Sequence, residues 1–437
     1  MRFMRTLIVC LNDRRVGTLS EGNDLWSFEY DPQWASAPDG FDLSPILKRS
    51  QLTHRDGGSE RPVQWYFDNL LPEEKLREVV SKEAGIKGED AFALLEYLGA
   101  ESAGSLVLLT PEASTHEPAG LRALPDNELS RRIRNLPRVT LGSGAPKHMS
   151  VAGAQNKLAV VYRDGVLYEP VGNEPSTHIL KPNVVNADYP SSVINEYLTM
   201  SLALRLRLNV PPVLRRYTPE PVYVVARFDR YADVVGRTHR SHIIDACQLL
   251  NKSRSFKYQA ATLQTLVDIV PYCRNRASAR MRLYQWLVFN LLIANNDNHL
   301  KNLSFRVSAE GIELSPAYDL LSTGAYHTRA LANERATWPA VELAIGLPEA
   351  PNFGAVTRGS VLRAGELLGL GRDTSQRELD RLLQALPDAL NGLVRSIEAE
   401  NARLPDAARQ FLAGEMRLIA VIQNLVVAEM VHRLTRR

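Results

Sequence analysis

The chain has 437 residues, of which 45% are hydrophobic and 23% are charged, and its formal net charge is +3. A chain of this length can bury a large core and is expected to form two or three domains. The charge excess is too small to indicate nucleic-acid binding by itself. The three cysteines, Cys10, Cys247 and Cys273, fit no metal-binding spacing, which indicates a reducing compartment.

The N-terminal segment is expected to be a strand rather than a signal peptide. Its apolar run is only Leu7–Leu11, and polar residues follow at once. No apolar run approaches the roughly 20 residues needed to span a bilayer. We therefore expect a soluble, cytoplasmic protein with no membrane partner.

The first part of the chain mixes strand and helix patterns. Alternating apolar residues predict strands at Thr6–Leu11, Val16–Ser20 and Asp24–Tyr30. Helical spacing predicts helices at Val63–Asn69, Pro72–Ala84, Asp90–Leu98 and Asp126–Leu136. The segment Pro111–Gly120, rich in Pro, Ser and Thr, is the best linker candidate.

The middle of the chain is strand-rich, and the rest is predicted to be mostly helical. Strands are predicted at Lys157–Tyr162, His178–Lys181, Val213–Tyr217 and Val222–Phe228, around a helix at Val193–Leu206. Helices are predicted at Ala260–Val270, Ala277–Ile293, Gly359–Leu368, Ser375–Ala385, Ala389–Asn401 and Pro405–Leu434. This order predicts an α+β, two-lobed fold with a β-rich N-terminal lobe and an all-helical C-terminal lobe.

The most informative motif places Asp297 and Asn302 with four residues between them. In protein kinases this spacing puts a catalytic base and a magnesium ligand on one loop. A predicted β-hairpin, residues 303–314, then leads to Asp319, and a hairpin can return a second metal-binding carboxylate to that loop. The alternative is a polar loop that caps the preceding helix, which would explain the Asn-rich composition.

Upstream residues supply candidates for holding phosphates. The small residues of Val151–Lys157 would let backbone N–H groups approach phosphate oxygens, although an ordinary hairpin turn is the alternative. Lys181 ends a predicted strand and Glu196 lies in the next helix, which is the order of the phosphate-binding lysine and its glutamate partner in kinases. Either residue, taken separately, is usually a surface residue. The ordered series that continues to Asp297 favours a phosphoryl-transfer site.

Five motifs, in this order, resemble those of the HipA family. These serine/threonine protein kinases are the toxins of bacterial HipA–HipB toxin–antitoxin modules. The motifs are Tyr66–Glu73, Ser150–Lys157, Ala226–Arg230, Asp297–Asn302 and Tyr318–Ser322. The resemblance runs nearly end to end, with two departures: Ala226 and Ile244 stand where the family often has glutamate.

The resemblance implies a protein kinase fold, ATP as phosphate donor and Mg²⁺ as cofactor. Asp297 would be the catalytic aspartate, and Asn302 and Asp319 would bind magnesium. Family members phosphorylate the serine before the phosphate loop, here Ser150, and that charge would displace the loop and switch the enzyme off. The nucleotide-binding residues implied are Ala152, Gly153, Ala154, Gln155, Asn156, Lys157, Lys181, Ala226, Arg227, Phe228, His299, Leu300, Lys301, Asn302, Tyr318 and Asp319.

The resemblance also implies an organisation and partners. Residues 1–115 would form a HipA N-terminal subdomain, 116–230 the kinase N-lobe with phosphate loop and hinge, and 231–437 the helical C-lobe with the catalytic loop. The partner would be a HipB-like helix-turn-helix antitoxin, with DNA contacted mainly through that complex. The substrate would be an aminoacyl-tRNA synthetase, with glutamyl-tRNA synthetase the first candidate. Two alternatives stay open: a catalytically silent co-repressor bound to the antitoxin on DNA, and a kinase of lipids or small molecules.

Overall fold

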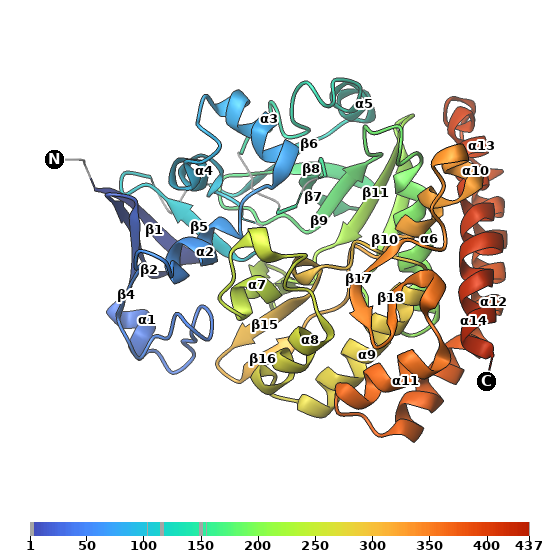
Figure 1. The fold of residues 1–437 in the computed structure, drawn as a ribbon. Coiled ribbons are helices and arrows are strands. Elements are labelled where there is room, and N and C mark those ends of the chain that lie inside the picture. Colours follow the sequence, from blue (N-terminus) through green and yellow to red (C-terminus); the bar gives the residue numbers. More distant parts are fainter. Residues whose placement is uncertain (1–3, 103, 114–117, 148–151, 154, 437) are drawn as a thin grey trace. The chain divides into compact units, whose positions relative to one another are not determined.

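The computed structural model describes residues 4–102, 104–113, 118–147, 152–153 and 155–436. The chain forms two compact units, and it passes between them several times (Figure 1). The first unit comprises residues 1–181, 225–257 and 304–315. The second comprises residues 182–224, 258–303 and 316–437.

The first unit begins with a five-stranded sheet in the order β4-β3-β2-β1-β5 (Figure 1, blue, with β5 in cyan). Its strands are β1 (Arg5–Leu11), β2 (Arg14–Gly22), β3 (Leu25–Tyr30), β4 (Thr53–Arg55) and β5 (Leu106–Leu109). Its helices are α1 (Pro32–Ser36), α2 (Pro62–Asp68), α3 (Glu74–Ala84) and α4 (Ala91–Leu98). Local signals set the helix ends: Gly85 takes the left-handed conformation after α3, and the Asp90 side chain accepts from the N–H of Ala93 to cap α4.

The first unit continues with an antiparallel group of strands in the order β9-β7-β8-β6. These are β6 (Gly120–Ala123), β7 (Leu158–Arg163), β8 (Val166–Val171) and β9 (His178–Pro182). The helix α5 (Asp126–Arg134) lies between β6 and β7 in the chain. The shorter elements are β12 (Arg230–Ala232), β13 (Thr238–Arg240), β14 (Ile243–Asp245), β15 (Ser304–Ser308), β16 (Gly311–Leu314), α7 (Ala246–Leu249) and η1 (Arg254–Phe256). β15 and β16 confirm the predicted hairpin. The predicted linker Pro111–Gly120 lies partly outside the described residues.

The second unit is mostly helical. Its main helices are α6 (Ser192–Arg205), α8 (Leu263–Ile269), α9 (Arg276–Leu292), α11 (Arg358–Leu367), α12 (Arg372–Asn401), α13 (Asp406–Val421) and α14 (Ala428–Thr435). Its short helices are η2 (Val270–Tyr272), η3 (Leu300–Asn302), η4 (Thr323–His327), α10 (Arg329–Ala332), η5 (Asn333–Arg335), η6 (Phe353–Ala355) and the π-helical η7 (Ile422–Val427). Its strands are β10 (Val213–Tyr217), β17 (Glu342–Leu347) and β18 (Ala350–Asn352), while β11 (Pro221–Ala226) crosses into the first unit.

Two predictions about the C-terminal half are wrong. The region after residue 230 is not all-helical, because strands β12 to β18 lie in it. The two helices predicted on either side of Pro387 are one helix, α12. Pro387 removes one backbone hydrogen bond. However, the leucines at 382, 386, 390 and 393 are all buried, and burial of this apolar face outweighs that loss.

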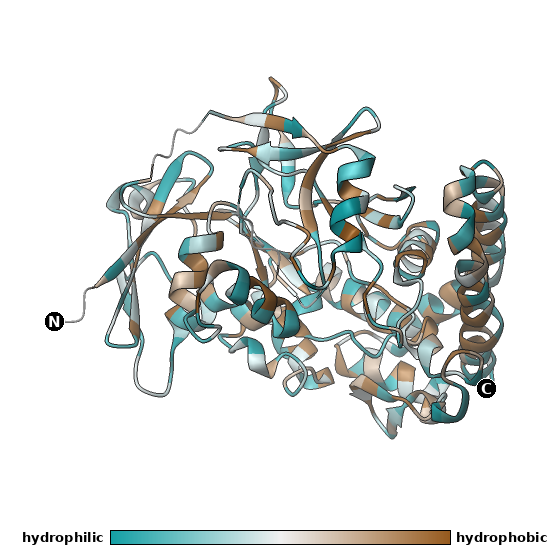
Figure 2. Cartoon of the chain, turned by 90° about the horizontal axis from the view of Figure 1, so that it is seen from above, coloured by the Kyte–Doolittle hydropathy of each residue, from teal (hydrophilic) through white to brown (hydrophobic). Residues whose placement is uncertain are grey.

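The C-terminal helical segment Asp406–Thr435 is, by length and composition only, apolar enough to cross a membrane. The expectation from the sequence concerned an uninterrupted apolar run, and charged residues such as Glu415 and Arg417 interrupt this segment. Brown apolar and teal polar residues alternate along these helices (Figure 2). The buried residues of this segment are Ala408, Glu415, Leu418, Ile419, Val421, Ile422, Val426, Val427, Met430 and Leu434. This one-sided burial is the pattern of an amphipathic core helix.

Candidate active site

The loop that carries Asp297 begins with a sharp turn after α9. Ala294 adopts the left-handed conformation, with φ of 51°, and its carbonyl accepts from the N–H of Gly324 at 2.7 Å. A Cβ on Gly324 would lie only 2.7 Å from the Cβ of Ala294, so glycine is required at this close approach. These contacts fix where α9 ends and where the loop starts.

Asparagines hold the loop in shape. The side chain of Asn295 accepts from the N–H of Asp297 at 3.0 Å and donates to Asn290 at 2.8 Å. The side chain of Asn302 donates to the carbonyl of Asp297 at 2.8 Å. The Asn-rich composition therefore fixes the backbone of Asp297, whose side chain is half-buried and accepts from the Tyr258 hydroxyl at 2.6 Å. The next predicted site residues, 299–302, are buried.

The orientation of Asn302 suits a magnesium ligand. Because its amide nitrogen donates to the carbonyl of Asp297, its amide oxygen is left as the group that can bind a cation. Magnesium prefers hard oxygen ligands and keeps several waters, so an amide and a carboxylate are a sufficient donor set. Asn302 and Asp319 are the residues predicted to form this pair.

Asp319 lies in a strained segment that α6 holds in place. Its φ is 51°, a left-handed value that is uncommon for a residue other than glycine. Asn195 of α6 pairs with the backbone of Ser322 through two hydrogen bonds, of 3.0 and 2.7 Å, and Thr199 donates to the carbonyl of Leu320. The side chains of α6 thus position the chain just after Asp319.

The segments that carry Asn302 and Asp319 are tied together within the second unit. The Tyr318 hydroxyl donates to the carbonyl of Lys301 at 2.6 Å.

Burial, together with the negative charges of Glu196 and Asp319, raises the pKa of the Tyr223 hydroxyl well above its ordinary value of 10. Tyr223 therefore stays neutral as a common neighbour of both carboxylates, a contact that sequence reasoning missed.

The predicted phosphate loop lies in the first unit, and Ser150 and Ala154 fall outside the described residues. Gly153 has a φ of 110°, and a Cβ there would meet the Lys157 ammonium at 2.8 Å. The Lys157 ammonium donates to the carbonyl of Ala152, so this side chain closes the loop on itself. Gln155 and Asn156 are half-buried.

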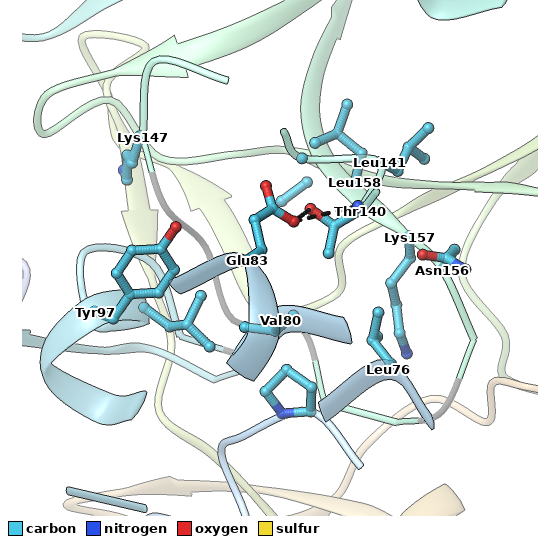
Figure 3. A pocket seen from close by; sticks show the side chains of 14 residues that line it. Leu76, Val80, Glu83, Tyr97, Thr140, Leu141, Lys147, Asn156, Lys157 and Leu158 are labelled. Carbon is cyan, nitrogen blue, oxygen red and sulfur yellow. Dashed lines mark hydrogen bonds between the residues drawn. The ribbon is translucent and has the colours of Figure 1, made fainter. Parts of the chain in front are cut away.

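A small cavity adjoins this loop. Asn156 and Lys157 line it together with residues of α3, and nearby Thr140 donates to Glu83 at 2.8 Å (Figure 3). Its volume of about 60 Å³ is far below the several hundred Å³ of a typical ligand pocket. This cavity is therefore too small to be the nucleotide site.

The motif Tyr66–Glu73 supports the phosphate loop, which sequence reasoning did not predict. Pro72 forms a parallel β-bridge with Gly153, and the N–H of Glu73 donates to the carbonyl of Gly153 at 3.2 Å. The carboxylate of Glu73 accepts from Lys257 at 2.5 Å. The motif thus links the loop to Lys257, the residue directly after η1.

The side chain of Arg227, in the predicted hinge, binds other residues of the first unit. Its guanidinium donates to both oxygens of Asp229, at 3.0 and 2.7 Å, and to Ser176 at 3.1 Å. It also lies 3.6 Å from the carboxylate of Glu101. The Arg227 side chain is therefore buried among polar and charged partners of the first unit. Ala226 and Phe228 flank Arg227 in the chain. Lys181, the predicted phosphate-binding lysine, is buried near the C-terminal end of β9.

The second departure from the family pattern has a clear structural setting. Ile244 is buried in β14, where an apolar side chain fits. Asp245 caps α7 in a capping box with Gln248, whose side chain also donates to the carbonyl of Tyr66 at 2.9 Å. Asp245 and Gln248 therefore serve local structure.

The loop holds a half-buried carboxylate and an amide, and a hydrogen bond ties it to the segment that carries a second carboxylate, Asp319. These residue types suit phosphoryl transfer, as in protein kinases. Two family models match the chain: the HipA N-terminal domain over residues 7–109 and the HipA-like C-terminal domain over residues 149–388. The chain belongs to the HipA family and is a serine/threonine protein kinase.

Known relatives agree over most of the chain. The serine/threonine-protein kinase toxin HipA of Shewanella oneidensis is 30% identical over 407 residues, covering 88% of each chain. The protein Y4mE of Sinorhizobium fredii is 35% identical over 340 residues, covering 74% of this chain and 78% of Y4mE. The solved structure of Shewanella oneidensis HipA with HipB and operator DNA is similar, with a TM-score of 0.77 and 28% identity over 98% of this chain and 99% of that one.

Proposed function

We propose that this kinase transfers the γ-phosphoryl group of ATP to a protein hydroxyl with Asp297 as the base. Asp297 would orient the acceptor hydroxyl and take its proton while the bond from the phosphorus to ADP breaks. Lys181 and the loop Ala152–Lys157 would hold the phosphates, and backbone atoms of Ala226–Phe228 would meet adenine. His299–Asn302 and Tyr318 would line the nucleotide site.

Asn302 and Asp319 would hold Mg²⁺, which neutralises phosphate charge when bound. The observation that carries this proposal is the orientation of Asn302, whose amide oxygen is left for a cation by the hydrogen bond to Asp297. The domain boundaries proposed are 1–115, 116–230 and 231–437.

Removal of magnesium tests the phosphoryl-transfer proposal. With γ-labelled ATP, we expect label in protein when Mg²⁺ is present and a loss of more than about 100-fold when EDTA is added. Restoring excess Mg²⁺ should recover the signal. Persistent absence of label with Mg²⁺ present would instead favour the silent co-repressor, and label only in a lipid or small molecule would favour the other kinase class.

The cellular role proposed is that of a toxin that halts translation. The family suggests an aminoacyl-tRNA synthetase as substrate, with glutamyl-tRNA synthetase the first to test. The complex of Shewanella oneidensis HipA with HipB and operator DNA supports a HipB-like antitoxin as partner, with DNA contacted mainly through it. We place the protein in the cytoplasm, without a membrane partner.

Autophosphorylation at Ser150 is proposed as the off switch. A phosphate there would add about −1.5 to −2 charge beside the loop that holds the nucleotide phosphates. We expect Ser150→Ala to abolish the main autophosphate while transfer to a protein acceptor stays within about twofold of wild type at early times. Mass spectrometry of the purified kinase after incubation with ATP measures this, with Ser143→Ala as the matched control. A main phosphosite elsewhere would contradict it.

A further inference from the structure

The hydroxyl of Tyr258 lies on the carboxylate of Asp297. It donates to Oδ1 at 2.6 Å, a short hydrogen bond to a charged acceptor. The tyrosine ring also packs edge-on against His299, with ring centroids 4.8 Å apart and an interplanar angle of 83°. Tyr258 thus contacts the catalytic loop with both its ring and its hydroxyl.

This position is the one that an acceptor hydroxyl needs. A base takes a proton only from a group within about 2.6–3.2 Å, and the Tyr258 hydroxyl already occupies that range at Oδ1. Tyr258 is 47% exposed, so its ring can swing into solvent without opening a buried core. A hydroxyl that is well placed yet easily displaced can compete with substrate for the base.

We propose that Tyr258 is a gating residue that occupies the acceptor position on Asp297 until a protein hydroxyl displaces it. This inference rests on the proposed role of Asp297 as the base. The gate keeps water from the base when no acceptor is bound. In the reaction it suppresses, a water oxygen bonds to the γ-phosphorus, the bond to the ADP oxygen breaks, and the water proton passes to Asp297.

The substitution Tyr258→Phe tests the gate, because phenylalanine keeps the ring against His299 and removes only the hydroxyl. The probe is water: purified full-length protein is incubated with ATP and Mg²⁺ without an acceptor, and free inorganic phosphate is measured. We expect Tyr258→Phe to release phosphate about 5-fold faster than wild type, the order expected when one competing hydrogen bond is removed. With casein as acceptor, we expect a KM lowered by a similar factor and an unchanged kcat.

Control variants distinguish the gate proposed for Tyr258 from the proposed role of Asp297 as the base. Tyr272→Phe removes the hydroxyl of another exposed tyrosine in the same unit and should leave phosphate release unchanged. Asp297→Asn should release almost no phosphate, and if it keeps full activity, the assignment of the base fails. Equal phosphate release by wild type and Tyr258→Phe, with Asp297→Asn inactive, overturns the gate alone. Phosphotyrosine at 258 would also overturn it, because Tyr258 would then be an acceptor.

Discussion

Replacing Asp297 by asparagine is expected to lower phosphoryl transfer by about 10²- to 10⁴-fold, the usual contribution of a general base. Asparagine keeps the shape of the side chain and an oxygen that can still accept from Tyr258. The backbone bonds from Asn295 and Asn302 do not involve the carboxylate, so the loop should keep its conformation. Transfer of labelled phosphate from ATP to protein, measured at equal protein concentrations, gives the effect.

The matched control for this substitution is Asp268→Asn. Asp268 lies in α8 of the same unit, is exposed, and accepts only a local hydrogen bond from Gln264. Asp268→Asn should retain wild-type activity and melt within about 2 °C of wild type, since surface substitutions change stability little. Asp297→Asn should melt in the same range, because the hydrogen bonds that hold its loop go to the backbone of residue 297. Substantial activity in Asp297→Asn with normal melting would remove Asp297 from the role of base.

Short-range features of this site could be predicted from the sequence. The spacing of Asp297 and Asn302 and the hairpin before Asp319 are local patterns, and the hairpin is confirmed by β15 and β16. Periodicity also predicted the strands β1, β2 and β3 near their observed bounds. These features depend on residues close together in the chain.

Long-range contacts could not be predicted in this way. The bond from Tyr258 to Asp297 joins residues 39 positions apart, and no local pattern marks Tyr258 as its partner. The side chain of Arg227 lies 3.6 Å from the carboxylate of Glu101, which is far away in the chain, and no local pattern predicted this pairing. Pro387 gave a local signal to break a helix, and the burial of leucines along α12 overrode it. Such outcomes are set by tertiary packing.

Glu101→Gln is expected to have the largest effect on stability. Glu101 is fully buried, and its carboxylate accepts from Lys147 at 2.9 Å, Arg230 at 2.9 Å and Arg240 at 3.0 Å. Removing one partner of a buried charge cluster typically costs about 3–5 kcal/mol, because the remaining charges stay buried without compensation. We therefore expect a large fall in melting temperature, with Glu96→Gln on the exposed face of α4 as the matched control.

The dependence of this loss on pH distinguishes charge from packing. Burial alone would raise the pKa of Glu101, but the surrounding cations, Lys147 and Arg240 foremost, hold it well below its ordinary value of 4.5. A carboxyl group with a lowered pKa in the folded state contributes its full stability above its unfolded pKa and loses it as the pH falls toward the folded one. The gap in unfolding free energy between wild type and Glu101→Gln should therefore be widest near neutral pH and narrow below about pH 4.5. A gap that does not change with pH would mean that shape, not charge, explains the loss.

The same substitution should also impair catalysis, because the cluster joins parts of the first unit that are proposed to bind the nucleotide. Lys147 precedes the segment that contains Ser150, Arg227 lies in the proposed hinge, and Arg230 follows it. Ser176, which also donates to Glu101 at 2.7 Å, precedes β9 and its Lys181. One carboxylate thus fixes the chain before the proposed phosphate loop, before Lys181 and just after the proposed hinge. At a temperature where Glu101→Gln remains folded, we expect KM for ATP to rise more than kcat falls. An unchanged KM would limit Glu101 to a role in stability.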